Sequence, residues 1–328
     1  MEKMYKNKEN IVLYDECHLC PRNCMVDRNA GQKGVCGMTG KLRLARAALH
    51  FWEEPCISGE RGSGAIFFSG CSLHCVFCQN EDISRGLAGK EIDDKRLVEI
   101  MHELKAKGAN NLNLVTPGHY VPTVIKAVEQ AKNEGLDIPV IYNTSGYETV
   151  DTIKALEGVV DVYLPDFKYM NPQIAEKYSH AGDYPPVAKL AIEEMVRQKS
   201  RCLFYPEGST LKDSMKNGTV TSEAEEGYLI GQGIIVRQLL LPGLLSDAKE
   251  IVRYLHERYG DSIYLSLMSQ YTPLKHVEKY PELNRKVTDE EYEAYIDYAI
   301  EIGVEKGFIQ EGDVAEESFI PHFDCEGV

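Results

Sequence analysis

The chain has 328 residues, with 36 Lys or Arg against 51 Asp or Glu, and a formal net charge of −15 at pH 7. This acidic balance argues against a general binder of nucleic-acid backbones, which needs clustered positive charge. A hydrophobic share of 43% is ordinary for a globular protein and excludes wholesale disorder. The length favours one large domain with a small appendage.

The first residues of the chain lack the apolar core of a signal peptide, and no apolar stretch reaches membrane-spanning length. The best candidate for a span, residues 233–245, is broken by Arg237, Gln238 and Pro242. Ten cysteines occur, several of them in short clustered spacings, and without a secretory signal this favours metal binding over disulfides. We therefore expect a cytoplasmic protein without membrane or nucleic-acid partners.

Residues 1–60 form a cysteine-rich, turn-rich segment with little periodicity, and we expect them to bind a metal. The segment contains a C-x2-C-x3-C motif and one further cysteine, which together give Cys17, Cys20, Cys24 and Cys36. Four thiols are a complete ligand set for zinc or for a second iron–sulfur cluster. The spacing leans toward iron, while a closed four-thiolate set suits zinc equally. The structural alternative is free thiols that pack a small subdomain.

From residue 61 to 328, short apolar strands alternate with amphipathic helices six times. The strands are expected at 65–69, 112–116, 139–143, 159–164, 234–241 and 263–268, and the helices at 93–107, 121–134, 150–156, 172–178, 246–259 and 289–302. Such alternation predicts parallel strands in βαβ units. Six units fit an α/β fold with an incomplete (β/α)6 TIM-like barrel, although a doubly wound open sheet would produce the same pattern.

Local signals support this division. Helix N-caps are expected at Asp93-Asp94, at Ser246-Asp247 and at Thr288-Asp289. Residues 201–231 are polar and interrupt the alternation between the fourth helix and the fifth strand, and we interpret them as a variable loop.

The most informative motif is a C-x3-C-x2-C triple, Cys71, Cys75 and Cys78, directly after the first strand of the core. Thiolates are the usual iron ligands of iron–sulfur clusters, and a four-iron cluster normally takes four of them. A triple on one loop would leave the fourth iron free to bind something else. Zinc usually closes its site with four ligands, so a lone triple fits zinc poorly.

This triple, with Phe77 before its last cysteine, resembles the radical S-adenosylmethionine (radical SAM) superfamily. Residues 66–80 and 45–59 resemble more narrowly its pyruvate formate-lyase-activating-enzyme-like branch. The resemblance implies a [4Fe-4S] cluster on the three cysteines and S-adenosylmethionine (SAM) on the open iron. It implies reductive cleavage of SAM to a 5′-deoxyadenosyl radical that abstracts hydrogen. It further implies a glycyl radical enzyme as the protein substrate and a flavodoxin- or ferredoxin-type electron donor.

The resemblance also assigns roles to polar positions at the ends of the core strands, where barrels place their chemistry. The family's two-glycine-glutamate motif is represented only by Gly118. Strand alternation puts residues i and i+2 on one face, so Asp166 and Lys168 should point the same way. The expected cofactor-binding residues are Phe77, Gly118, Asn143 and Ser145, and the candidate catalytic residues are Asp166 and Lys168. Polar loop residues or a surface ion pair would explain the same residues structurally.

Two other classes of function remain open from the sequence. The protein could be a radical SAM enzyme that acts on a small molecule or a peptide, because the same triple serves many substrates. It could instead be a non-catalytic iron–sulfur electron carrier. Arg237 and Gln270 lie on the last two strands, where each could face a cavity or satisfy a core carbonyl.

Overall fold

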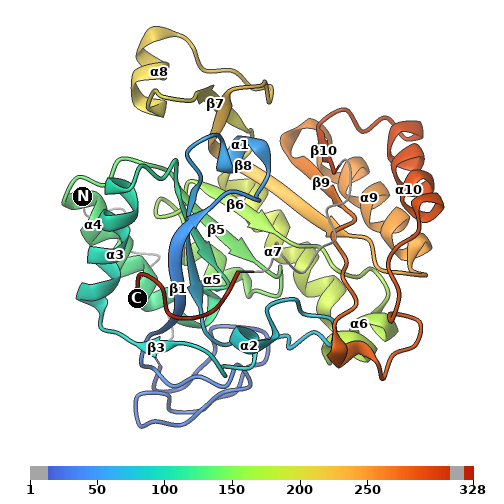
Figure 1. The fold of residues 1–328 in the computed structure, drawn as a ribbon, viewed down its shortest axis with the longest axis horizontal. Coiled ribbons are helices and arrows are strands. Elements are labelled where there is room, and N and C mark those ends of the chain that lie inside the picture. The colour runs from blue at the N-terminus through green and yellow to red at the C-terminus, as the bar shows by residue number, and fades with distance from the viewer. Residues whose placement is uncertain (1–13, 311–320) are drawn as a thin grey trace.

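The computed structural model of the protein describes residues 14–310 and 321–328. The N-terminus, where we expect no signal peptide, lies outside these residues. Within them, ten strands form one sheet, and helices cover its outer face (Figure 1). The strands are β1 (Arg43–His50), β2 (Ser63–Phe68), β3 (Lys90–Glu91), β4 (Leu112–Val115), β5 (Val140–Thr144), β6 (Val162–Pro165), β7 (Leu203–Pro206), β8 (Tyr228–Leu239), β9 (Tyr264–Met268) and β10 (Gly307–Ile309). The α-helices are α1 (Pro55–Ser58), α2 (Glu81–Ser84), α3 (Asp94–Ala106), α4 (Val121–Asn133), α5 (Val150–Ala155), α6 (Pro172–Ser179), α7 (Tyr184–Gln198), α8 (Leu211–Asn217), α9 (Leu245–Tyr259) and α10 (Asp289–Glu301).

The strand order is β10-β9-β8-β6-β5-β4-β2-β1-β3, with β7 paired to β8. Successive pairs from β2 to β10 are parallel, whereas β1, β3 and β7 pair antiparallel. His50 at the end of β1 and Phe308 in β10 line the same cavity, so the sheet curves until its two sides face each other. The expected α/β fold with a partial barrel is confirmed, and all six expected strand–helix units are present.

The helix signals explain most of the elements. The Asp93 carboxylate accepts the N–H of Arg96 at 2.8 Å and caps α3, and Thr288 forms a capping box with Glu291 at the start of α10. The prediction that Ser246-Asp247 caps the N-terminus of α9 is wrong. The N-cap of α9 is Leu244, which has no side-chain cap bond. Asp247 instead accepts the backbone N–H groups of the loop after β6, at 2.8 and 3.0 Å.

Several elements were not expected from the sequence. β1 lies within the segment that we interpreted as turn-rich, and its alanine-rich sequence has little strand propensity of its own. It forms because it pairs along β2, as strand formation depends on tertiary context. The helix α7 follows α6 after a short turn and begins at Tyr184-Pro185-Pro186, a start that prolines permit. The interruption at 201–231 contains β7 and α8, which project together from the body of the protein (Figure 1).

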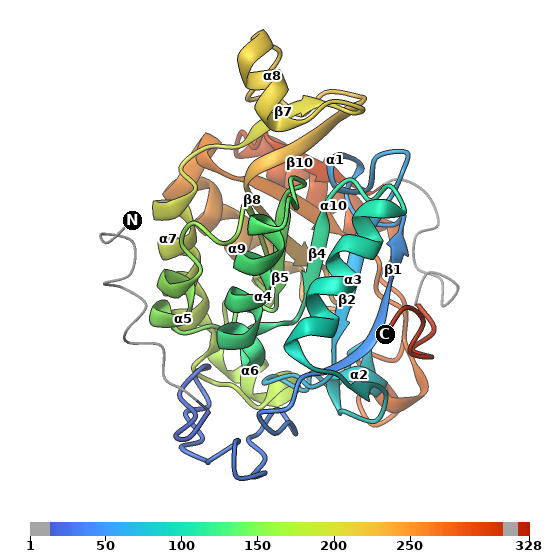
Figure 2. The ribbon, with the colours of Figure 1, turned by 90° about the vertical axis from the view of Figure 1, so that its left-hand side faces the viewer.

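Residues 14–41, here called the flap, contain no α-helix or strand. They lie at the end of the sheet where β2 leads into the cysteine loop, opposite to α8 (Figure 2). Arg28 anchors the flap. Its side chain is buried, donates to the carbonyls of Met38, Thr39 and His119, and lies against the Tyr120 ring. The flap is therefore held on the carboxyl ends of the parallel strands. None of the helices in the described ranges has the length and apolar character to cross a membrane.

Candidate active site

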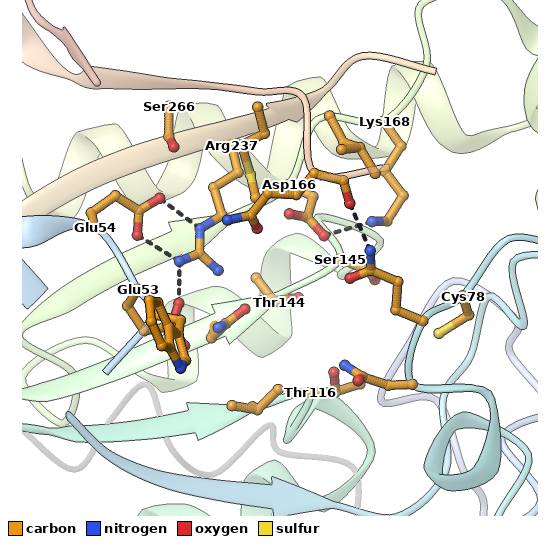
Figure 3. Close-up of a pocket in the computed structure, with 18 of the residues that line it drawn as sticks. Glu53, Glu54, Cys78, Thr116, Thr144, Ser145, Asp166, Lys168, Arg237 and Ser266 are labelled. Atoms are coloured by element: carbon orange, nitrogen blue, oxygen red, sulfur yellow. Dashed lines mark hydrogen bonds and ion pairs between the residues drawn. The ribbon is translucent and has the colours of Figure 1, made fainter. Parts of the chain in front are cut away.

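A cavity of about 500 Å³ lies within the curve of the sheet (Figure 3). This volume is within the range of small-molecule sites. Its walls come from the cysteine loop after β2, from the ends of β4, β5 and β6, from β8, β9 and β10, and from the segment after β1. Side chains far apart in the sequence therefore meet around one space.

The three cysteines of the triple all line this cavity. The N–H of Leu73 donates to Cys71 Sγ at 3.4 Å, and the Ser179 hydroxyl donates to Cys75 Sγ at 2.9 Å. Burial raises the pKa of all three thiols, that of Cys78 to about 12. A bound metal centre would reverse this effect, because metal ligation takes the thiolate form.

The arrangement of these thiols suits a cluster better than a single ion. Across the described residues, no three His, Cys, Asp or Glu side chains converge as the ligands of one metal ion. A single zinc ion needs its sulfurs about 2.3 Å from one point, whereas the cysteines of an iron–sulfur cluster can each bind a different iron. Cys71, Cys75 and Cys78 come from one loop and line one cavity, so they fit three irons of a four-iron cluster whose fourth iron would face the cavity.

Asp166 and Lys168 both line the cavity, whereas Phe167 between them is fully buried. The alternation expected at the end of β6 is present. Lys168 Nζ lies 2.6 Å from Asp166 Oδ2 (Figure 3). Burial alone would lower the pKa of Lys168, but the Asp166 carboxylate and the nearby Cys75 raise it above its usual value. Lys168 is therefore a cation held beside the thiol triple.

The remaining expected cofactor residues divide into two groups. Phe77, Asn143 and Ser145 line the cavity, and the Phe77 ring makes an edge contact with Tyr169 at 6.3 Å. Gly118 is not among the lining residues. A Cβ at Gly118 would lie 2.6 Å from Glu148 Oε1, so this glycine makes room for a buried carboxylate rather than for a ligand in the cavity.

Thr116 is the residue that the end of β4 presents to the cavity instead of Gly118. Its φ of 58° is in the left-handed region that non-glycine residues rarely adopt. Such backbone strain occurs often at binding sites, so Thr116 is a candidate that the sequence did not single out. Gln270 also lines the cavity, and its carbonyl accepts the Gln79 side-chain amide at 2.6 Å.

At the wall opposite the cysteines lies a second charged group (Figure 3). Arg237 Nε donates to Glu54 Oε1 at 2.8 Å, and its Nη2 binds both Glu53 and Glu54. The amide of Asn113 donates to Glu53 at 2.8 Å. Burial would raise the pKa of Glu54, but Arg237 lowers it below the usual value. Arg237 therefore faces the cavity, and two carboxylates on one guanidinium leave this wall with net negative charge.

The mouth of the cavity carries exposed apolar side chains. Phe51, Trp52 and Ile309 line the cavity and are 50%, 59% and 48% exposed. The sequence did not identify them, because β1 and β10 bring them together only in the folded protein. Single exposed apolar residues are common on protein surfaces, but their grouping at the mouth of a site indicates contact with a partner.

The four N-terminal cysteines lie in the flap and do not line the cavity. Cys17 and Cys36 are buried, while Cys20 and Cys24 are partly exposed. Cys24 and Cys36 lie near each other, because a Cβ built on Gly34 would be 3.2 Å from Cys24 Sγ and 3.8 Å from Cys36 Sγ. The expected N-terminal set thus lies outside the cavity that the triple lines, and its role as a metal site stays a prediction.

Comparisons with known proteins agree with this geometry. Residues 65–206 match the family model described as the Radical SAM superfamily. The chain is 28% identical over 294 residues to the uncharacterized protein MJ0674 of Methanocaldococcus jannaschii, covering 88% of this chain and 75% of that protein.

Two solved structures are similar at a distance. Streptococcus suis SuiB bound to S-adenosylmethionine has a TM-score of 0.47 at 13% identity, over 74% of this chain and 49% of that one. Methylornithine synthase (PylB) has a TM-score of 0.46 at 12% identity, over 78% of this chain and 66% of that one. The chain spans about half the length of SuiB, and likenesses of this size say nothing about activity.

The match over residues 65–206 thus indicates a radical SAM superfamily domain in this part of the chain. This class of domain indicates an enzyme and implies a [4Fe-4S] cluster and SAM, for which the cavity provides a thiol triple and a polar wall. The narrower activating-enzyme branch is not specifically supported by the matches.

Proposed function

We propose that the protein cleaves SAM reductively and uses the product radical to abstract hydrogen from a polypeptide. The observation that carries the proposal is the lining of one cavity by three partly buried thiols and by polar groups from three successive strand ends. When bound, the cluster and SAM would supply the one-electron chemistry, and the protein would supply orientation and exclude water.

Residues of the chain divide this work. Cys71, Cys75 and Cys78 would ligate the cluster and leave one iron facing the cavity. Lys168, charged and partly shielded from solvent, would attract the carboxylate of SAM. Asp166 holds the Lys168 ammonium group in place, with Oδ2 at 2.6 Å from Nζ. Phe77 offers an aromatic face beside the triple on which the adenine could pack.

The polypeptide substrate is supported by the mouth of the cavity. Phe51, Trp52 and Ile309 form an exposed apolar rim, and aromatic residues are enriched in protein contacts. A glycine of a glycyl radical enzyme is our first choice of target, with a flavodoxin- or ferredoxin-type donor as the electron source. A small-molecule substrate would not need this rim, and an electron carrier would need no cavity behind it.

The test is anaerobic reconstitution with iron and sulfide, reduction with dithionite, and measurement of 5′-deoxyadenosine formed from SAM. The native chain should produce it, and Cys75→Ala should reduce the rate by at least about a thousandfold because the cluster loses a ligand. Cys325→Ser is the matched control, since Cys325 lies outside the cavity and should behave as the native chain. Cleavage by Cys75→Ala at the native rate would exclude the proposal.

The choice of substrate needs a second readout. Mixing the reduced protein and SAM with a glycyl radical enzyme should give an organic radical on that partner, detected by electron paramagnetic resonance. Trp52→Ala should weaken this transfer without changing SAM cleavage in the absence of partner. If SAM is cleaved but no radical forms on the partner, the polypeptide assignment fails while SAM cleavage stands.

A further inference from the structure

We propose that Cys17, Cys20, Cys24 and Cys36 hold a second iron–sulfur cluster in the flap, separate from the cluster of the cavity. The proposal rests on the arrangement of the four sulfurs, and it does not depend on SAM cleavage. Three features of the flap support it: donors placed at each sulfur, the spacing of the sulfurs, and the anchoring of the flap on the barrel.

Each of the four sulfurs accepts an N–H group from the protein. The donors are the backbone N–H of Arg22 to Cys20, of Val35 to Cys24 at 3.3 Å and of Met38 to Cys36, and the guanidinium of Arg28 to Cys17 at 3.8 Å. Two of them follow the cysteine by two positions, as Leu73 does at Cys71 in the loop of the cavity. Hydrogen bonds to ligand sulfurs stabilise thiolate and tune iron–sulfur clusters.

The sulfurs are near one another without converging. A Cβ placed on Gly34 would lie 3.2 Å from Cys24 Sγ and 3.8 Å from Cys36 Sγ, so both sulfurs border the same small space. A larger residue at Gly34 would push into that space, which explains why glycine stands there.

The C-x2-C-x3-C spacing of Cys17, Cys20 and Cys24 in the sequence favours iron over zinc. Within residues 14–310 and 321–328, no three potential ligands are placed around one point as a single ion requires. This holds for the flap thiols and equally for Cys71, Cys75 and Cys78, whose domain implies a cluster. Four thiols that each bind a different iron need no common centre. The flap therefore shares this property with the triple, and it adds a fourth thiol.

The flap is also held firmly enough to support a cluster. Arg28 is 1% exposed and lies between the rings of Tyr14 and Tyr120, at 4.7 and 5.4 Å. Arg22 donates to the carbonyls of Ser72 and Ser179 at 2.8 and 3.0 Å. These two cations offset the negative charge that four thiolates bring.

The flap cysteines and the triple of the cavity lie next to each other in space, although they are separated in the sequence. The Cys36 carbonyl would lie 2.8 Å from a Cβ on Gly70, the residue before Cys71, and the charge of Cys36 acts on Cys71. A cluster in the flap would therefore lie beside the loop that carries the first cluster, on the side away from the cavity lining.

The test removes the first site and asks what remains. The Cys71→Ala/Cys75→Ala/Cys78→Ala variant, purified and reconstituted without oxygen, should retain about four irons and four sulfides per chain. Adding Cys24→Ser and Cys36→Ser should remove them, and adding Cys325→Ser instead should not. One zinc per chain without iron, or a folded chain without metal, would overturn the proposal.

A second variant covers the case in which the triple variant does not fold. Cys24→Ser alone, in the otherwise native chain, should lower the iron content from about eight to about four per chain. An unchanged iron content would contradict a cluster in the flap. Because this readout is metal content, it is separate from the rate of SAM cleavage that tests the proposed function.

Discussion

Two buried carboxylates, Glu54 at the cavity wall and Glu148 after β5, show how differently the same side chain behaves in two regions of the protein. They are 7% and 5% exposed. Arg237 binds Glu54 through two nitrogens and lowers its pKa although burial acts in the opposite direction. Glu148 accepts the hydroxyls of Thr144 and Tyr142, and no ion pair reaches it within the described residues.

The second oxygen of Glu148 is buried without a hydrogen bond, and burial raises the pKa of this carboxyl to about 7. Equal burial therefore goes with pKa shifts in opposite directions, and the presence or absence of a cationic partner decides which occurs. The cavity wall keeps a fixed negative charge, whereas the region beneath Gly118 holds a carboxyl that is half protonated near neutral pH.

Removing the partner of Glu54 should have the largest effect. Arg237→Met leaves Glu53 and Glu54 buried without a counter-ion, and the free energy of unfolding at pH 7 should fall by about 3–5 kcal/mol. Urea unfolding followed by circular dichroism measures it. Arg258→Met is the control, because its pair with Glu193 is more than half exposed on both sides and should be worth less than about 1 kcal/mol. Equal losses of unfolding free energy in Arg237→Met and Arg258→Met would contradict the distinction between the buried and the exposed ion pair.

The ion pair of Glu54 with Arg237 also makes the free energy of unfolding depend on pH. The folded pKa of Glu54 is below the ordinary value of 4.5. The stability that it contributes is therefore fully present above pH 4.5 and is lost as the pH falls through the folded pKa. Arg237→Met should lack this loss on acidification.

For Glu148, stability should change with pH in the direction opposite to that for Glu54, and Glu148→Gln should remove this change. Because the folded pKa of about 7 is above the ordinary 4.5, native stability falls as the pH rises from 4.5 to about 7. Glutamine keeps an oxygen for Thr144 and Tyr142 but cannot ionise. The variant should match the native chain at pH 4.5 and be more stable by about 3 kcal/mol at pH 8. Parallel stability curves for the two proteins across this range would show that Glu148 is not the titrating group.

The smallest effect is expected at Asp166, a half-buried carboxylate with a cation at its side. Asp166→Ala and Lys168→Ala should weaken SAM binding by about tenfold, or about 1.4 kcal/mol, while cluster content and fold stay intact. Titration with SAM and the yield of 5′-deoxyadenosine measure this. Lys132→Ala is the control, since it breaks a similar pair with Asp161 far from the cavity. Native affinity in both cavity variants would leave only a structural role for the pair.

The sequence predicted those features that depend on neighbours along the chain. The triple, the strand–helix units and the pairing of Asp166 with Lys168 all follow from local spacing and strand alternation. Arg237 meets Glu54 across 183 positions, and no local pattern contains that contact. The same reason explains why β1 was missed, because its strand form depends on pairing with β2. Gly118 was assigned to the cofactor because it alone resembles the family's two-glycine-glutamate motif, but the group that approaches it is the Glu148 carboxylate.

The contacts of Arg22 have a consequence for the order in which the protein is assembled. The side chain reaches the Ser179 carbonyl, which is 157 positions further along the chain. The flap precedes the fourth strand–helix unit in the chain, so it cannot complete this contact until that unit has left the ribosome and folded. Its cysteines therefore remain in an unfinished segment until that unit has folded, and the metal that we propose for the flap would bind only after this step.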